Sequence, residues 1–494
     1  MGNAQSIAGH DCLVAAVGHN PSMVTFRTDA FFTFRIPLYN LDTPVIPAAI
    51  TYPSTTEQVA SILSCAVDNG YKVQARSGGH SYANYGISLV STQNLLNLAN
   101  LYFLIGLGGT DGAVVVDLKK FQQFSVDPDT LVATIGAGTL LGDLQTRLDY
   151  AGGRAVAHGT CPQVGTGGHF TIGGLGPLSR EWGMALDHIV EAEVVLANST
   201  IIRASEAHNQ DVFFAIRGAA AGFGIVTEFK LHTHEAPGEA IQYSFIWNLG
   251  NTSEKAELFK DWQRLISSKD LSRKFASELI VSVAGVIISG TYFGSKEEWE
   301  AFKIEKHFPP SNPANIVTLT DWMGMLGSGA ETLTESVVGG IPVPFYSKSM
   351  SFTPENLIPD RGVDTMFKYI GTTEKGTTVW FIIFNVEGGA TNDIPINATA
   401  YAHREAIMWM QSYAVNLLGP ISTTTKNFLN GLNAVAASYH PSSDFGAYPG
   451  YVDPQLIDPQ TSYWGPNLPR LQTIKAEIDP HDVFHNPQSV QALS

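Results

Sequence analysis

The first half of the chain alternates short apolar runs with amphipathic ones. Residues 47–79 begin extended, continue as a helix with a Ser/Thr cap and Glu57 in its first turn, and end as a strand before two glycines. "AVVVDLKKF" and "TLVATIGAG" predict strands, and "TLLGDLQTRLDYAGG" predicts a helix that ends at glycine. "IVEAEVVLANSTIIRAS" predicts a hairpin that turns at Asn198-Ser199. Short strands and helices therefore alternate over residues 43–235.

From about residue 240 the pattern changes to antiparallel strands with helices between them. "IQYSFIWNL", "ASELIVSVAGVIISGTYFG", "SKSMSF" and "TTVWFIIFNVEGG" predict the strands, and "SEKAELFKDWQRLIS" predicts a helix. "YAHREAIMWMQSYAVNL" also predicts a helix. The most apolar stretch, residues 279–293, contains serine and glycine and predicts buried strand, so no membrane span is expected. This half indicates a second, α+β domain whose sheet forms one wall of a cleft.

A chain of 494 residues is too long for one ordinary core. We predict an N-terminal domain over residues 1–235, a substrate-binding domain over 236–430, and a C-terminal segment over 431–494 that returns to the first domain. That segment carries a helix and then an extended stretch punctuated by proline.

The formal net charge of −16 argues against nucleic acid or an anionic membrane surface as a partner. A neutral or weakly polar substrate fits this charge better. The 14 histidines are scattered without metal-ligand spacing, so no metal is expected.

The cellular compartment of the protein is indicated by its lysine content, its glycosylation sequons and its cysteines. Few lysines and three glycosylation sequons (Asn198, Asn251, Asn397) suit a secreted chain whose signal peptide is absent from this sequence. A disulfide between Cys12 and Cys65 would suit an oxidising compartment, and two buried thiols are the alternative. Cys161 then remains as an odd cysteine that needs an explanation.

Two glycine-rich stretches, "QARSGGHSYANYG" and "GTCPQVGTGGHFTIGGLG", each contain Gly-Gly-His. The chain lacks four common site motifs: the Rossmann fingerprint, the P-loop, the zinc-hydrolase motif and the nucleophile elbow of α/β-hydrolases. Successive small residues can instead expose backbone N–H groups as anion-binding nests, and two such loops could hold the pyrophosphate of a dinucleotide. The alternative is that these glycines only form tight turns.

Four separated motifs resemble one family. "ARSGGHSYANYG", "GTCPQVGTGGHFTIGGLG" with "GMALDHIVEAEVVLANS", "DVFFAIRGAAAGFGIVTEF" and "LQTIKAEIDPHDVFHNPQSV" together resemble the berberine-bridge-enzyme-like flavoproteins. Within that group the chain is most similar to the fungal oligosaccharide oxidases. The resemblance implies an α+β fold: a two-lobed FAD-binding domain of the vanillyl-alcohol-oxidase type, and a substrate domain with an antiparallel sheet.

The resemblance implies FAD bonded at two points. His80 matches the histidine joined to the flavin 8α-methyl, and Cys161 matches the cysteine joined to flavin C6. His169, in the second Gly-Gly-His, matches no attachment point and is interpreted as a supporting or packing residue. Two bonds to the ring are expected to raise its redox potential. The further FAD contacts carried over by position are Arg76, Ser77, Gly78, Gly79, Ser81, Gly165, Gly168, Gly173, Gly174, Ile225 and Val226.

The same resemblance implies oxidation of a reducing-end sugar at C1 to the 1,5-lactone, with O2 reduced to H2O2. A general base must take the O1 proton. The relatives use a tyrosine in "Y-x-N-Y-x-D", which places Tyr451 of "AYPGYVDP" at the base position. Their strand "W-x-x-x-W-D-F-H-G-G" supplies an aspartate where this chain has Asn385, which is unable to accept a proton. Tyr82 is a further candidate for stacking or for hydrogen bonding to O1.

Side chains two apart on a strand share a face, so Ile383 is expected to point into the cleft with Asn385. Isoleucine would crowd a hydroxymethyl group and so would favour xylose, and the alternative is that Ile383 only packs in the sheet. Trp380 and Trp322 are expected to stack further sugar rings, and we expect a monomer.

Three other functions fit the motifs. One is a berberine-bridge-like oxidase of an alkaloid, a phenolic compound or another non-carbohydrate alcohol. Another is a dehydrogenase of the same fold that does not react with O2. The third is a carbohydrate-binding protein without catalysis, which intact His80 and Cys161 disfavour.

Overall fold

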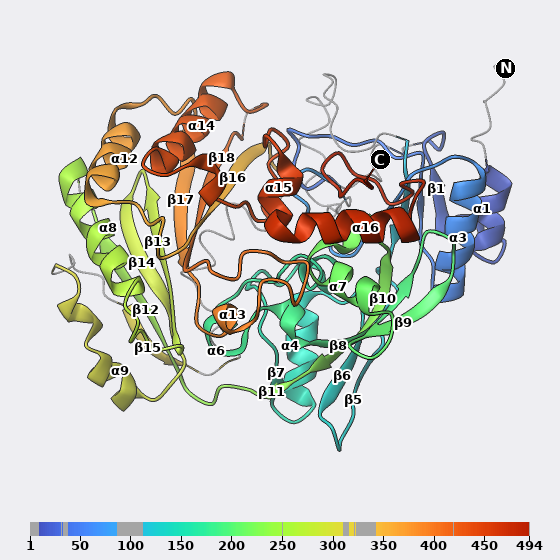
Figure 1. Ribbon diagram of the computed structural model, residues 1–494, viewed down its shortest axis with the longest axis horizontal. Coiled ribbons are helices and arrows are strands. Elements are labelled where there is room, and N and C mark those ends of the chain that lie inside the picture. The colour runs from blue at the N-terminus through green and yellow to red at the C-terminus, as the bar shows by residue number, and fades with distance from the viewer. Residues whose placement is uncertain are drawn as a thin grey trace.

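The computed structural model describes residues 9–30, 32, 38–85, 112–248, 250–309, 316–320, 322, 342–417 and 419–493. Two bodies of sheet and helix lie side by side in it (Figure 1). One body contains a four-stranded and a five-stranded sheet, and the other contains a seven-stranded sheet.

The four-stranded sheet begins the first body. Its strands, in spatial order, are β1 (Val24–Phe26), β2 (Ala49–Thr51), β4 (Val114–Asp117) and β3 (Val73–Arg76). β2, β4 and β3 are parallel. All four residues of β4, three valines and Asp117, are buried, as is typical of a central parallel strand covered on both faces. β3 ends directly before the first glycine loop and so delivers it to one edge of the sheet.

The five-stranded sheet is antiparallel. Its order is β5 (Phe124–Val126), β6 (Val132–Gly136), β10 (Ile225–His232), β8 (Ile189–Val195) and β9 (Ile201–Ser205). β8 and β9 form the hairpin predicted around Asn198-Ser199. A two-stranded ribbon joins β7 (Arg154–Ala155) to β11 (His234–Glu235).

Six helices of the first body are described. They are α1 (His10–Ala16), α3 (Thr56–Asp68), α4 (Leu141–Tyr150), α5 (Thr166–His169), α6 (Ser179–Trp182) and α7 (Gln210–Ala219). Thr55 caps α3 by accepting a hydrogen bond from the N–H of Gln58. The apolar face of α3 lies fully buried in the core of this body.

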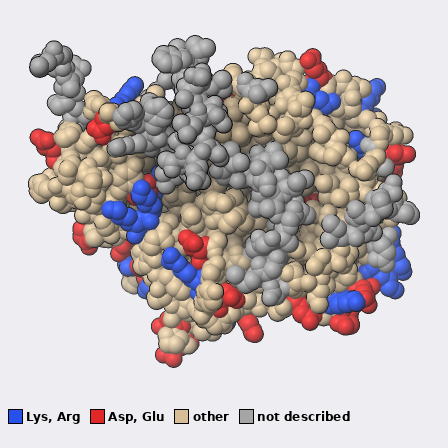
Figure 2. Space-filling view, turned by 180° about the vertical axis from the view of Figure 1, so that it is seen from behind, with Lys and Arg blue, Asp and Glu red and all other residues tan. Residues whose placement is uncertain are grey.

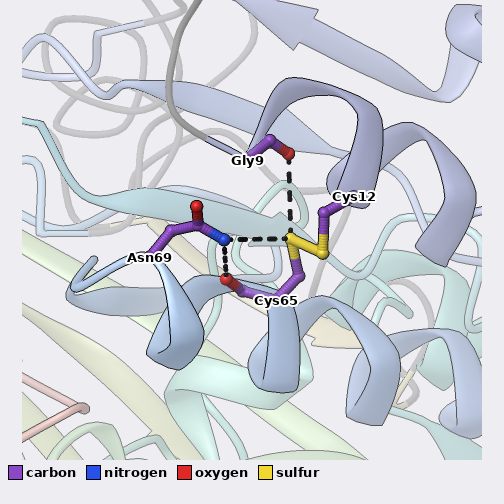
Figure 3. The surroundings of a disulfide bond; sticks show 4 residues. All are labelled: Gly9, Cys12, Cys65 and Asn69. Atoms are coloured by element: carbon purple, nitrogen blue, oxygen red, sulfur yellow. Dashed lines mark hydrogen bonds between the residues drawn. A yellow bond between two sulfur atoms is a disulfide. The ribbon is translucent and has the colours of Figure 1, made fainter.

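A disulfide joins α1 to α3 through Cys12 and Cys65, as expected from the sequence (Figure 3). Their Cα atoms lie 5.9 Å apart, within the usual range for such a bond. Cys65 Sγ also lies near the carbonyl of Gly9 and the side chain of Asn69 (Figure 3).

The second body is built on one antiparallel sheet. Its order is β15 (Ile316–Thr320), β12 (Ala240–Trp247), β14 (Gly285–Tyr292), β13 (Phe275–Ser282), β17 (Val379–Val386), β18 (Met408–Val415) and β16 (Phe345–Phe352). Figure 1 shows α8 (Thr252–Ile266), α12 (Asp360–Thr372) and α14 (Thr423–Ala437) along its outer face. The shorter helices α9 (Lys296–Phe302) and α13 (Ala390–Asp393) lie at the ends of strands.

One predicted helix is wrong. Residues 401–417 form an irregular start and then β18, in which every residue is buried. β18 lies between β17 and β16, with helices on one face and a cavity on the other, so apolar residues are needed on both faces. A run that is apolar on both faces does not separate strand from helix by its periodicity.

The C-terminal segment carries α15 (Pro459–Trp464) and α16 (Leu468–Ile478) and lies against the first body. Figure 1 shows α16 beside α7. The N–H of Val73 in β3 donates to the carbonyl of Val483 at 2.8 Å, so the tail contacts the strand that bears the first glycine loop. Lys475 is fully buried and bonds Asp479 at 2.7 Å, which fixes the turn after α16.

On the face shown in Figure 2, Lys and Arg side chains of the described residues are interspersed with Asp and Glu. Within the described ranges, none of the helices combines the length and the apolar character needed to cross a membrane.

Candidate active site

The two glycine loops meet backbone to backbone. A Cβ on Gly78 would lie 2.3 Å from the nitrogen of Gly165, so only glycine permits this approach. Gly79 has φ of 78°, a conformation that side chains rarely adopt. Ser77 ties the loops together, because its hydroxyl donates to the carbonyl of Ala137 at 2.6 Å and accepts from the N–H of Gly167 at 3.2 Å.

A cavity of about 540 Å³ lies where these loops face the seven-stranded sheet. This volume is in the range typical of ligand sites. Its lining includes most of the predicted cofactor positions: His80, Cys161, Arg76, Ser77, Gly78, Gly79, Ser81, Gly165, Gly168, Ile225 and Val226. Tyr451, Tyr82, Asn385 and Ile383 line the same cavity.

His80 presents a neutral imidazole to the cavity. Burial, with a smaller effect from the nearby Arg76 charge, lowers the pKa of His80 to about 4. The centroid of its ring lies 4.7 Å from the centroid of the Tyr39 ring. Arg76 is itself buried and bonds Asp117 at 2.5 Å, so its charge is held in place. An uncharged imidazole nitrogen can act as a nucleophile, as attachment to a cofactor requires.

Cys161 carries a half-buried thiol at the cavity surface. Two imidazoles, those of His158 and His169, hydrogen-bond to Gly159, two residues before Cys161. Burial lowers the pKa of His158 to about 4 and that of His169 to about 3, so both rings are neutral. The N–H of Gly159 donates to Nε2 of His169 at 2.8 Å, and Nδ1 of His158 donates to the carbonyl of Gly159 at 2.6 Å. This geometry agrees with the supporting role expected of His169.

Three tyrosines cluster in the lining of the same cavity. The ring of Tyr82 lies 5.7 Å from that of Tyr451, and Tyr451 lies 5.0 Å from Tyr448. Tyr448 Oη accepts a hydrogen bond from the N–H of Gly174 at 2.9 Å. Burial raises the pKa of Tyr82 to about 12 and raises the pKa of Tyr451 well above its ordinary value. Both phenols are therefore protonated near neutral pH.

Two polar residues that the sequence reasoning missed lie beside them. Gln411 of β18 donates to Tyr82 Oη at 3.1 Å. Glu278 of β13 stands directly opposite Asn385 in the β13–β17 ladder, and all three side chains line the cavity. A lone carboxylate in the apolar run "SELIVS" was a signal for Glu278, whereas Gln411 was hidden by the helix predicted over its segment.

Glu387 is a third missed residue. It is 4% exposed, lines the cavity, and its Oε2 has no hydrogen-bond partner among the described residues. Burial raises the pKa of Glu387 to about 8, against the opposing charge of Arg180. Arg180 donates to the backbone carbonyl of Glu387 and to that of Phe275.

Four predicted site residues lie elsewhere. Gly173 and Gly174 do not line the cavity. A Cβ on Gly173 would lie 2.8 Å from the Tyr448 ring, and a Cβ on Gly174 would lie 2.3 Å from Ala185. Both glycines therefore allow close packing of their neighbours. Trp380 points to the other face of β17 and packs on Phe428 of α14, because odd and even residues of a strand face opposite sides. Trp322 is 2% exposed and packs against other aromatic rings. The expectation that these tryptophans stack sugar rings is wrong.

The lining fits an FAD molecule. At Gly168 a Cβ would meet no atom within 4 Å, so any side chain there would occupy the cavity. Arg76 Nε is buried without a partner among the described residues, and a neutral imidazole and a thiol face the same space. Within the described ranges, no group of three or more His, Cys, Asp and Glu side chains is arranged to hold a metal ion.

Comparison with known proteins gives consistent likenesses. A family described as "FAD binding domain" matches residues 99–205, and one described as "Berberine and berberine like" matches residues 447–491. The FAD-linked oxidoreductase sorD of Penicillium rubens is 40% identical over 486 residues, covering 98% of each chain.

Two solved structures extend the likeness to the fold. Xylooligosaccharide oxidase from Myceliophthora thermophila C1, solved with xylobiose, has a TM-score of 0.84 and 30% identity over 99% of this chain and 100% of its own. Glucooligosaccharide oxidase from Acremonium strictum, described with 6-S-cysteinyl, 8α-N1-histidyl FAD, has a TM-score of 0.83 and 28% identity over the same shares. The predicted fold class is confirmed.

Proposed function

The chain belongs to the berberine-like family of FAD-linked oxidoreductases, and from this premise we propose that it is an oligosaccharide oxidase. It oxidises the anomeric C1 hydroxyl of a reducing-end sugar to the 1,5-lactone, with O2 reduced to H2O2. One observation carries the proposal: both candidate attachment residues, His80 and Cys161, share a cavity with Tyr451 and Tyr82.

FAD is the cofactor, and His80 and Cys161 are the proposed points of attachment. When bound, FAD supplies the acceptor for two electrons from the substrate and passes them to O2. The neutral state of the His80 imidazole supports a bond through its nitrogen. The glycine loops bring backbone N–H groups to the cavity, where they suit a pyrophosphate.

Tyr451 is the proposed general base. Because burial keeps its phenol protonated, it accepts a proton only as it loses its own. In the proposed relay the substrate O1–H bond breaks and a Tyr451 O–H bond forms, while the original phenol proton passes to the Glu278 carboxylate. Glu278 thereby supplies, from β13, the acceptor that Asn385 lacks on β17. The substrate loses this proton and a hydride from C1.

The substrate wall supports xylose at the reacting position. Ile383 lines the cavity and is 8% exposed, beside Phe381 and Asn385 on one face of β17. Its branched side chain offers no hydrogen bond and crowds the place of a hydroxymethyl group. Catalytic efficiency is therefore expected to be higher on xylobiose or xylotriose than on cellobiose.

The test is kcat/KM for H2O2 release on these sugars, with the aldonic acid measured as product. Replacing Ile383→Gln should move preference toward cellobiose, and Ile280→Val is a matched control on β13. Cellobiose ahead of xylobiose in the unchanged protein would contradict the argument from Ile383 and leave the oxidase intact.

A second candidate is oxidation of a hydroxylated aromatic compound, which the aromatic wall of the cavity favours. Phe381 stacks on Tyr413 at 5.0 Å and Tyr413 on Phe345 at 4.9 Å, while Tyr82 meets Phe345 edge-on at 5.0 Å. Such a wall suits a flat apolar molecule as well as a sugar ring. Substrate-dependent H2O2 from phenolic alcohols, without any from sugars, would favour this candidate.

Secretion is also proposed. Asn198, Asn251 and Asn397 are exposed, and the Cys12–Cys65 disulfide suits an oxidising compartment. Protein from a eukaryotic host should lose mass on treatment with an N-glycosidase, and an unchanged mass would contradict glycosylation. We expect a monomer, which sedimentation would test.

A further inference from the structure

Segment 446–453, which carries Tyr448 and Tyr451, is bonded to strand β16 at the edge of the seven-stranded sheet. Ser351 Oγ accepts a hydrogen bond from the N–H of Gly446 at 2.8 Å, and the N–H of Ser351 donates to the carbonyl of Gly446 at 3.0 Å. Ser349 Oγ accepts from the N–H of Tyr448 at 3.0 Å. These two serines lie two residues apart and so share a face of the strand.

Lys348 directly precedes Ser349, so its side chain leaves the opposite face of β16. Its Nζ bonds Oδ2 of Asp453, which is 3% exposed. Asp453 is held further, because Gln488 Nε2 donates to its carbonyl at 2.7 Å and the N–H of Gln455 donates to its Oδ1 at 2.9 Å. The segment is therefore attached to both faces of one strand, with Tyr451 between the two attachments.

The other active-site phenol is tied to the same strand. Gln411 Nε2 donates to Ser347 Oγ at 3.4 Å and to Tyr82 Oη at 3.1 Å. Ser347 lies two residues before Ser349 and is 2% exposed. Strand β16 thus bonds the segment that carries Tyr451 directly, and it is linked to Tyr82 through Gln411.

We infer that β16 is the element that positions the general base, with Ser349 and Lys348 as its principal positioning residues. This inference rests on the proposed role of Tyr451. Neither residue touches the substrate in this account: each acts through the backbone or through Asp453. A displacement of a catalytic group by about 1 Å can cost about 100-fold in rate, so the attachments matter for catalysis although the cavity wall stays intact.

The test compares Ser349→Ala, its conservative counterpart Ser349→Thr, and Lys348→Met in the flavin-loaded full chain. Lys426→Met is the matched control, because Lys426 bonds Asp42, whose side chain is 6% exposed, at 2.9 Å. Among the described residues no hydrogen bond or ion pair joins Lys426 to segment 446–453. Two experiments are made: hydrogen–deuterium exchange of peptides covering 444–455, and steady-state kinetics of H2O2 release with xylobiose, which give kcat and KM.

Exchange in 444–455 should rise in Ser349→Ala and Lys348→Met and stay unchanged in Ser349→Thr and Lys426→Met. The value of kcat should fall roughly tenfold in Ser349→Ala and about 100-fold in Lys348→Met. In both variants KM should change less than about threefold. Unchanged exchange in Ser349→Ala would overturn the inference, as would an equal loss of kcat in Lys426→Met. If Lys348→Met fails to fold, the comparison of Ser349→Ala with Ser349→Thr tests the inference without it. Absence of turnover in the unchanged protein would contradict the proposed function, while the exchange result would still judge the attachment.

Discussion

Tyr451 and Tyr82 are phenols whose surroundings oppose ionisation. Burial dominates for both, and the neighbouring tyrosines and the carboxyls of Glu387 and Glu278 add to it for Tyr451. Both phenols are therefore protonated near neutral pH, and the proposed mechanism couples proton transfer at Tyr451 to a second acceptor. Glu278, which stands opposite Asn385 in the β13–β17 ladder, is the proposed acceptor.

Replacing Tyr451→Phe removes the proposed base and keeps the ring. We expect kcat to fall by about 10²–10⁴-fold, the usual contribution of a general base, with a much smaller change in KM. Steady-state H2O2 release measures it, and Tyr150→Phe, at a residue 85% exposed, is the control. A loss of less than about threefold would contradict the assignment.

Glu387 makes folding stability depend on pH. Its pKa is about 8 in the folded chain against 4.5 ordinarily, so between these values the folded state binds one proton more than the unfolded state. Its stabilising contribution is complete below about pH 4.5 and declines by up to about 1.4 kcal/mol per pH unit as pH rises toward about 8.

The variant Glu387→Gln is therefore expected to gain melting temperature relative to the unchanged protein at about pH 9 and not at about pH 5. Thermal unfolding of both proteins at the two pH values measures this difference. The same offset at both pH values would show that the Glu387 carboxyl does not titrate in this range.

At the scale of elements, the Cys12–Cys65 disulfide closes a loop with a sequence separation of 53. The chain-entropy relation gives about 4 kcal/mol for a loop of that length. Cys12→Ser with Cys65→Ser should lose about this much stability in denaturant unfolding, with flavin content unchanged because α1 and α3 lie outside the cavity lining. A loss of bound flavin at unchanged stability would reverse that interpretation.

The sequence predicted most of these elements, and its failures have physical causes. Alternation along "VWFIIFNVEGG" placed Ile383 and Asn385 on one face, and the structure agrees. Trp380 was assigned to the cleft although its even position puts it on the helix-covered face. β18 was predicted as a helix because a strand buried on both faces loses the period of two, and Gln411 was missed with it.

Motifs predicted that the two glycine loops, with His80 and Cys161, would share one site, and both residues line the cavity. Contacts between distant segments were beyond local patterns. Gly173 and Gly174 stand in the glycine-rich motif, yet their neighbours are Tyr448 and Ala185, which a linear sequence does not bring together. Likewise the pairing of Glu278 with Asn385 depends on the register of two strands far apart in the chain.

At the scale of the whole molecule, the cavity lies where the FAD-binding body, the seven-stranded sheet and the C-terminal segment meet. The glycine loops line the part of the cavity proposed for the cofactor, and β13, β17 and β18 line the part proposed for the substrate. Segment 446–453 brings Tyr451 into the same lining. Segment 446–453 bonds β16 and the tail that follows it bonds β3, so the C-terminal part of the chain is attached to both bodies. Function therefore depends on all three parts holding one arrangement.

The central claim is that one cavity joins a doubly attached FAD to a base that oxidises a sugar hydroxyl. The most direct measurement mixes the purified yellow protein with xylobiose without oxygen, follows the visible flavin absorbance, and then admits O2. We predict bleaching by the sugar, recovery of colour with stoichiometric H2O2 and xylobionic acid, and flavin that stays with the protein after acid precipitation. No bleaching by any sugar, or flavin released into the acid supernatant, would contradict the account.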